Sequence, residues 1–237
     1  MEEKGGDRLA ATIYSSLDRT IRGVIFDMDG VVLDTEKLYA RFWQEACIAL
    51  GYPMTRQQAL GMRSLNRQAG QAQLESYFGP GISREEVRRK RIELMDAYIE
   101  IHGVDPMPGI RETLMALKER GLATAIATSS PEERAKQYLH QLDLLELFDV
   151  ICSGDHVTHG KPAPDIYLLA AEKIGLPTEV CLAVEDSPAG ILSAHGAGCL
   201  PVFIPDQDEA DEKTGALLFA RIDRLTDIMD ILKEKQP

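Results

Sequence analysis

The sequence predicts an α/β protein with a Rossmann-like parallel sheet, helices on both faces of that sheet, and an inserted α-helical domain. Short apolar runs alternate with longer segments in which apolar residues recur at helical spacing. This alternation is typical of βαβ units, and strands that are apolar throughout are typical of a sheet covered on both faces. The expected strands are Gly23–Phe26, Leu122–Ala127, Phe148–Cys152, Val180–Val184 and Leu200–Ile204.

The stretch between Asp34 and Pro106 interrupts this alternation because it contains no convincing strand. Apolar residues at helical spacing begin there at Leu38, Leu74 and Val87, which predicts a small helical domain. Prolines and a glycine then mark the return of the chain to the sheet. The expected segments are 1–20 as a peripheral amino-terminal extension, 21–34 with 106–237 as the Rossmann-like core, and 35–105 as the helical domain.

The composition argues against several classes of protein. The 237 residues carry a formal net charge of −12, whereas a nucleic-acid-binding protein usually presents a basic face. No apolar run approaches the roughly 18 residues that span a bilayer, and residues 1–20 lack the apolar segment of a signal peptide. The four cysteines form no CxxC pair. We therefore expect a cytoplasmic protein with reduced thiols and no nucleic-acid or membrane partner.

Acidic, hydroxyl and basic residues follow the carboxyl ends of the expected strands. In an open parallel sheet these ends share one edge, and ligands bind there. Each residue alone could be a turn, a helix cap or a solvated surface group. Those local roles do not explain why acids and a cation share one edge. The residues are Asp27 and Asp29 after the first strand, Thr128, Ser129 and Ser130 after the second, Lys161 after the third, and Glu185 and Asp186 after the fourth.

Carboxylates gathered at one edge repel one another unless a cation lies among them. Oxygen ligands with open positions suit Mg²⁺, which takes a few carboxylates together with water and a substrate phosphate. Lys161 and Mg²⁺ would neutralise a phosphoryl group, and a carboxylate can attack that group to form an aspartyl-phosphate. The pattern therefore predicts phosphoryl transfer with Mg²⁺ as the cofactor.

Four stretches, in this order, resemble the four motifs of the haloacid dehalogenase superfamily. They are DMDGVVLDTE from Asp27, the Thr128 position, GKPAPDIY around Lys161, and VEDSPAGI around Glu185 and Asp186. The resemblance covers about residues 21–204, and the helical insertion is similar to the type-1 cap of that superfamily. By pattern the chain is similar to its cytosolic sugar-phosphate phosphatases and beta-phosphoglucomutase-like proteins.

The resemblance implies a catalytic role for each core residue. Asp27 would be the nucleophile, and Asp29 would protonate the leaving oxygen and then deprotonate the attacking water. Thr128 would hydrogen-bond the transferring phosphoryl group. Lys161 would hold that group and balance the charge of Asp27.

The resemblance also implies a metal site. Mg²⁺ would be bound by the side chains of Asp27 and Asp186 and by the backbone carbonyl of Asp29. Glu185 would be a further ligand or would lie just behind the ligands. Gly30 would let the chain turn sharply behind the acids.

Substrate specificity is expected to come from the helical insertion, because the core reads only the phosphate. The stretch LGMRSLNRQ from Leu60 resembles the cap loop that reaches toward the substrate. Arg63 and Asn66 in this loop are therefore candidate substrate-binding residues, together with Ser129, although a solvated loop arginine is the alternative for Arg63. The expected partner is a small phosphorylated metabolite such as a sugar phosphate, and the expected state is a monomer or a weak homodimer.

Other functions remain alternatives at this stage. A hexose-phosphate mutase would use the same site, but mutases of this branch typically carry a histidine where this chain has Tyr39. A 2-haloacid dehalogenase would need neither Asp29 nor a metal. A signalling receiver module would carry its acid pair after the first strand and has no counterpart of the insertion. A binding protein that has lost turnover is a further alternative, but this chain retains all the key groups of the site.

Two further motifs have simpler interpretations. His156 and His159 have a spacing that could suggest a metal site, but a loop leading to Lys161 explains them better. The basic run Arg88–Arg91 lies among glutamates that allow i,i+4 pairing on an exposed helix.

Overall fold

The computed structural model describes residues 11–14, 20–62, 65, 67–205 and 210–233. The chain divides into two compact units. The core unit comprises Met1–Val32 and Pro106–Pro237, and the helical unit comprises Leu33–Asp105. Among the described residues, no helix combines the length and the apolar character needed to cross a bilayer.

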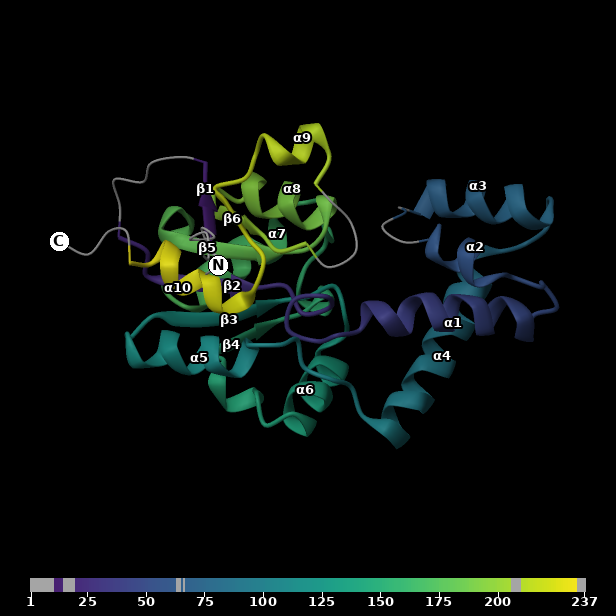
Figure 1. Cartoon of the computed structure of the whole chain (residues 1–237), viewed down its shortest axis with the longest axis horizontal. Coiled ribbons are helices and arrows are strands. Elements are labelled where there is room, and N and C mark those ends of the chain that lie inside the picture. Colours follow the sequence, from purple (N-terminus) through teal and green to yellow (C-terminus); the bar gives the residue numbers. More distant parts are fainter. Residues whose placement is uncertain (1–10, 15–19, 63–64, 66, 206–209, 234–237) are drawn as a thin grey trace, which may run out of the picture. The chain divides into compact units, whose positions relative to one another are not determined.

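A seven-stranded sheet forms the centre of the core unit, with β2 inside it (Figure 1). The strand order is β1-β7-β6-β5-β2-β3-β4, and all pairings are parallel except that of β1 with β7. This arrangement confirms the predicted Rossmann-like parallel sheet. The strands are β1 Ala11–Ile13, β2 Gly23–Phe26, β3 Ala123–Ala127, β4 Val150–Cys152, β5 Cys181–Glu185, β6 Leu200–Phe203 and β7 Ala220–Ile222.

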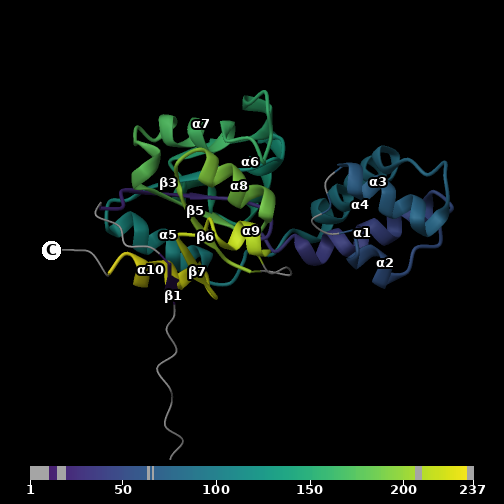
Figure 2. The same cartoon turned by 90° about the horizontal axis from the view of Figure 1, so that it is seen from above.

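Helices cover both faces of this sheet (Figure 2). On one face α7 packs against β2, β3 and β4, and α8 packs against α7, β5 and β6. On the other face α5 packs against β3 and α10. The helices are α5 Ile110–Glu119, α6 Glu132–Gln141, α7 Asp165–Lys173, α8 Pro188–Gly196, α9 Glu212–Gly215 and α10 Ile228–Ile231, with 3₁₀ turns η1 Leu145–Leu147, η2 Gly154–His156, η3 Thr178–Val180 and η4 Leu225–Asp227.

The edge of the sheet contains two strands that the apolar pattern does not predict. Ala11–Ile13, within the expected amino-terminal extension, pairs antiparallel with Ala220–Ile222. Both strands are only three residues long, so neither gives a recognisable apolar run. The first expected strand is correct in its bounds, whereas the other four are shorter or shifted by a residue or two.

Small side chains on two strands make room for one large residue of α7. Ala125 and Ala127 of β3 and Ala183 of β5 are fully buried and belong to the same core cluster as Tyr167. Tyr167 is itself completely buried. A helix can therefore approach the sheet closely and deliver a phenol hydroxyl to the carboxyl ends of the strands.

The described residues of the helical unit form four helices with a core of their own. Its buried cluster includes Trp43, Ala46, Met54, Leu74 and Val87. Burial of these apolar side chains explains why apolar residues recur at helical spacing in this part of the sequence. The helices are α1 Glu36–Ala49, α2 Arg56–Leu60, α3 Arg67–Phe78 and α4 Arg84–His102.

Candidate active site

The strand register places the acidic residues at the same level of the sheet. Phe26, the last residue of β2, pairs with Ile126 of β3 and Val184 of β5. The backbone N–H of Asp27 continues the ladder by donating to the carbonyl of Val184 at 2.9 Å. Asp27 and Glu185 are therefore adjacent at the carboxyl ends of two central parallel strands, where the sheet connections change direction.

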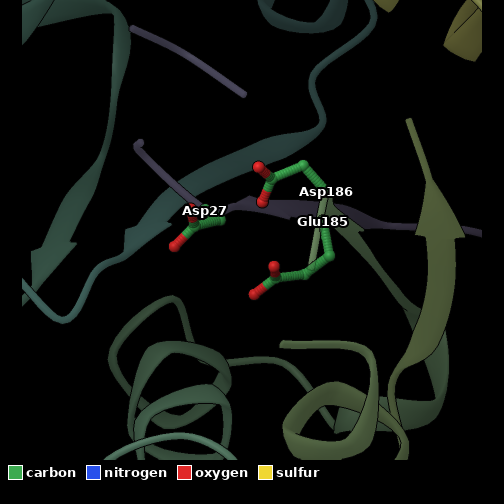
Figure 3. A group of neighbouring side chains, drawn as sticks. All are labelled: Asp27, Glu185 and Asp186. Carbon is green, nitrogen blue, oxygen red and sulfur yellow. The ribbon is translucent and has the colours of Figure 1, made fainter. Parts of the chain in front are cut away.

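Three carboxylates meet at this edge. One carboxylate oxygen from each of Asp27, Glu185 and Asp186 lies within 4.8 Å of the others. Successive side chains within a strand point to opposite faces of the sheet. Because β5 ends at Glu185, this alternation does not determine the direction of the Asp186 side chain. In Figure 3 the side chains of Glu185 and Asp186 both extend toward the side on which Asp27 lies.

Lys161 joins two of these carboxylates. Its Nζ lies 2.6 Å from Oδ1 of Asp27 and 2.6 Å from Oε1 of Glu185, and it also donates to the carbonyl of Ala127 at 2.9 Å. Only 8% of the lysine side chain is exposed. Buried ion pairs of this kind are poorly screened, so the ammonium offsets much of the local negative charge.

Glu185 is held from several directions and is fully buried. Its Oε1 accepts a hydrogen bond from the Tyr167 hydroxyl at 2.5 Å, and its Oε2 accepts one from the Ser187 hydroxyl at 3.3 Å. Tyr167, Ser187 and Gly190 of α8 form the cradle of this carboxylate. Gly190 belongs to it because a Cβ atom there would lie only 1.9 Å from the carboxyl carbon of Glu185. A side chain at position 190 would displace the carboxylate.

Asp29 lies beside the hydroxyl-bearing loop after β3. The Ser130 hydroxyl donates to Oδ2 of Asp29 at 3.1 Å, and the Ser130 backbone N–H donates to Oγ1 of Thr128 at 3.0 Å. Thr128 is fully buried, whereas Ser129 is exposed. The carboxylate of Asp29 is outside the close group of three, so this acid and Asp27 have different surroundings.

Burial sets the protonation of the central groups. Burial raises the pKa of Asp27 to about 7, opposed by the charge of Lys161 and assisted by the charges of Glu185 and Asp29. Burial would lower the pKa of Lys161, but Asp27 and Glu185 outweigh that effect and hold it above its ordinary value. Burial and then the charge of Glu185 raise the pKa of Tyr167, which stays a hydrogen-bond donor.

The donors present fit a hard divalent cation. All of the close ligand atoms are carboxylate oxygens, which favour Mg²⁺ or a similar ion over zinc or copper. Positive charge from such an ion would also oppose the effects of burial and of the neighbouring acids, which together raise the pKa of Asp27. The residues that could hold it are Asp27, Glu185 and Asp186.

The structure thus brings together most of the core residues singled out in the sequence: Asp27, Asp29, Thr128, Lys161, Glu185 and Asp186. The candidate substrate-binding residues Arg63 and Asn66 lie outside the described residues. Sequence reasoning did not single out Tyr167 or Gly190. Tyr167 lies six residues after Lys161 in the same motif, but only the packing of α7 shows that its hydroxyl reaches Glu185.

Comparison with families of known proteins agrees with this geometry. Residues 21–198 match the family model described as haloacid dehalogenase-like hydrolase. That match covers most of the chain and includes every core residue of the site. The chain belongs to the haloacid dehalogenase-like hydrolases.

Individual members of the family are similar over nearly the whole chain. The phosphorylated carbohydrates phosphatase of Thermotoga maritima is 33% identical, over 90% of this chain and 99% of that protein. Hexitol phosphatase B of Escherichia coli is 29% identical, over 90% of this chain and 96% of that protein. The crystal structure of a putative beta-phosphoglucomutase from Thermotoga maritima is 29% identical, with a TM-score of 0.73 over 91% of this chain and all of that one (100%).

The cradle around Glu185 gives a prediction for this family member. Gly190→Ala should lower the free energy of unfolding by about 1–3 kcal/mol, because overpacking a buried site forces neighbours to move. Gly196→Ala is the matched control on α8, since the nearest atom to its added Cβ would be Pro164 Cβ at 3.6 Å, an ordinary contact. Urea unfolding of both variants measures the difference. Equal stability of Gly190→Ala and the parent protein would contradict the packing described here.

Proposed function

We propose that this hydrolase is a phosphatase that cleaves a small phosphomonoester through an aspartyl-phosphate on Asp27. The observation that supports this most is the pairing of Lys161 with both Asp27 and Glu185, beside Asp186, at the carboxyl ends of the central strands. Phosphoryl transfer requires mainly positioning and stabilisation of charge. A nucleophilic carboxylate with a buried cation beside it supplies both.

In the proposed reaction Asp27 forms one bond to phosphorus while the ester P–O bond breaks. The leaving oxygen takes the bonding electrons and receives a proton from Asp29. Water then attacks the same phosphorus, Asp29 takes a proton from that water, and the Asp27 carboxylate is released with inorganic phosphate. Lys161 stays beside Asp27 throughout and holds the oxygens of the phosphoryl group.

The contact between Ser130 and Asp29 suits a group that alternates between acid and base. A hydroxyl both donates and accepts hydrogen bonds. Ser130 therefore donates to the Asp29 carboxylate in the arrangement observed and can accept from the carboxylic acid after protonation. The buried Thr128 hydroxyl accepts from the Ser130 N–H, which stabilises the conformation of the loop that carries Ser130 to Asp29.

We infer Mg²⁺ as the cofactor. Asp27, Glu185 and Asp186 would hold it, together with the backbone carbonyl of Asp29 as the family motif implies. When bound, the ion would neutralise charge on the phosphoryl oxygens. Its charge would also favour the ionised form of Asp27 that attack requires.

The substrate class follows from the relatives rather than from the geometry. Proteins similar over nine-tenths of this chain carry the names phosphorylated carbohydrates phosphatase and hexitol phosphatase B, and both names point to phosphorylated sugars or sugar alcohols. The resemblance to a putative beta-phosphoglucomutase supports a mutase as the second candidate. Tyr39, at the position where such mutases typically carry histidine, favours transfer to water.

We place this enzyme in the cytoplasm, as a monomer or weak homodimer without nucleic-acid or membrane partners. The net charge of −12 disfavours contact with nucleic acid and with anionic lipid. All four cysteines are free and buried, which suits a reducing compartment.

The raised pKa of Asp27 predicts proton release when Mg²⁺ binds. Below about pH 7 Asp27 of the metal-free protein carries a proton, whereas Mg²⁺ requires the carboxylate. Binding should therefore release close to one proton at about pH 6 and almost none at about pH 8.5, and affinity should rise with pH until about pH 7 and then level off. Titration calorimetry in buffers of different ionisation enthalpy measures the release. Asp27→Asn should abolish it, and a release that does not change between these pH values would contradict the assignment.

Turnover itself tests the proposed function. With Mg²⁺, the protein should release inorganic phosphate from at least one hexose or hexitol phosphate in a panel, and EDTA should stop the release. Asp27→Asn should lower kcat by at least about a thousandfold because the nucleophile is lost. Asp223→Asn is the matched control, since it removes the same charge from a side chain that is 67% exposed. Conversion of a sugar 1-phosphate to its 6-phosphate isomer would instead identify a mutase, and hydrolysis by Asp27→Asn at the parent rate would refute the mechanism.

A further inference from the structure

Two loops of the core unit carry the hydroxyl groups and the lysine of the candidate site, and they lie against each other. The loop after β3, residues 128–131, contains Thr128 and Ser130. The loop after β4, residues 153–161, leads to Lys161. The Thr128 backbone N–H donates to the carbonyl of Cys152 at 3.0 Å, and a Cβ atom at Gly154 would lie only 3.0 Å from the carbonyl oxygen of Ser129.

A partly exposed histidine and a partly exposed glutamate join these loops. Nε2 of His156 lies 3.0 Å from Oε2 of Glu132, the first residue of α6. Nδ1 of His156 accepts from the backbone N–H of Ser153 at 3.2 Å. With Nδ1 acting as the acceptor, a neutral ring must carry its hydrogen on Nε2 and donate it to Glu132. One imidazole therefore connects the backbone of one loop to the helix that begins at the end of the other.

Further contacts hold the same junction. Oδ2 of Asp155 accepts from the backbone N–H of Glu132 at 3.0 Å, so the β4 loop also caps α6. Lys136 binds the other oxygen of the Glu132 carboxylate at 2.7 Å. Lys136 and then His156 lower the pKa of Glu132, which keeps it ionised and able to accept from both.

We propose that His156 and Glu132 form a clasp that positions the phosphate-binding loops for the hydrolysis proposed above, on which this inference rests. Each loop also contacts an acid of the site, because Ser130 contacts Asp29 and Lys161 contacts Asp27. The clasp ties the second loop, at His156, to Glu132, which follows the first loop, so the distance between Ser130 and Lys161 depends on it. Both residues are positioning residues, because neither touches the carboxylates of the site.

A double-mutant cycle tests the clasp. Glu132→Ala and His156→Ala should each lower kcat/KM about tenfold, mainly through a higher KM, because a small displacement of binding groups weakens substrate positioning. The double variant should lose no more than about tenfold, since either substitution already opens the clasp. His159→Ala is the control from the same loop, where the ring pairs with Asp165 and is 71% exposed, and it should leave kcat/KM unchanged.

Two conservative variants separate the clasp from a local role of the ring. His156→Gln places an amide N–H within reach of Glu132 and should restore most of kcat/KM. His156→Asn keeps an acceptor near the Ser153 N–H but does not reach Glu132, so it should behave like the alanine variant. Rescue by asparagine and not by glutamine would show a local cap only and would overturn the clasp.

The same assays distinguish failure of the clasp from failure of the proposed function. If the parent protein hydrolyses a phosphomonoester and Asp27→Asn does not, the function stands and the cycle decides the clasp. The clasp would then be overturned if the losses in kcat/KM of the two single variants multiplied in the double variant. It would also be overturned if the single variants kept kcat/KM within twofold of the parent value. A parent protein inactive on every phosphomonoester would overturn the proposed function and the clasp together.

Discussion

The ammonium group of Lys161 lies between the carboxylates of Asp27 and Glu185 in a setting almost closed to water. Charges buried in this way cost several kcal/mol each unless partners compensate them. The single positive charge of Lys161 lies beside the group of three carboxylates formed by Asp27, Glu185 and Asp186. Burial raises the pKa of Asp27, and the neighbouring acids Glu185 and Asp29 raise it further. A buried group of carboxylates of this kind is suited to a divalent cation. The electrostatics of the site therefore follow from burial and from one cation shared between two acids.

The fold supports this charge arrangement through packing that lies behind the acids. Parallel register brings Asp27 and Glu185 side by side at the ends of β2 and β5. Tyr167 on α7 reaches Glu185 because the strands beneath that helix present small side chains. Gly190 on α8 leaves the space that the Glu185 carboxylate fills. Two helices on one face of the sheet thus hold Glu185 in place, and the charge of Glu185 acts at the edge where the strands have their carboxyl ends.

The sequence predicts the parts of the structure that depend on local pattern. The strand Gly23–Phe26 and the acids that follow it are recognisable because a buried apolar run ends abruptly in charge. The Tyr167–Glu185 contact and the close approach of Gly190 are not recognisable, because they depend on how α7 and α8 pack on the sheet. Ala11–Ile13 also escapes prediction, since three residues at an edge carry too little pattern. The link between His156 and Glu132 spans 24 residues, so only the fold shows it.

Trapping the covalent intermediate tests the role of Asp27 most directly. The metal-loaded enzyme would be mixed with a labelled sugar phosphate, quenched in acid during the first turnover, digested, and examined by mass spectrometry. The phosphoryl group should appear on the peptide that contains Asp27 and should be absent from the Asp27→Asn protein. A phosphoryl group on another residue would contradict the account. So would turnover in which no phosphorylated enzyme forms although phosphate is released.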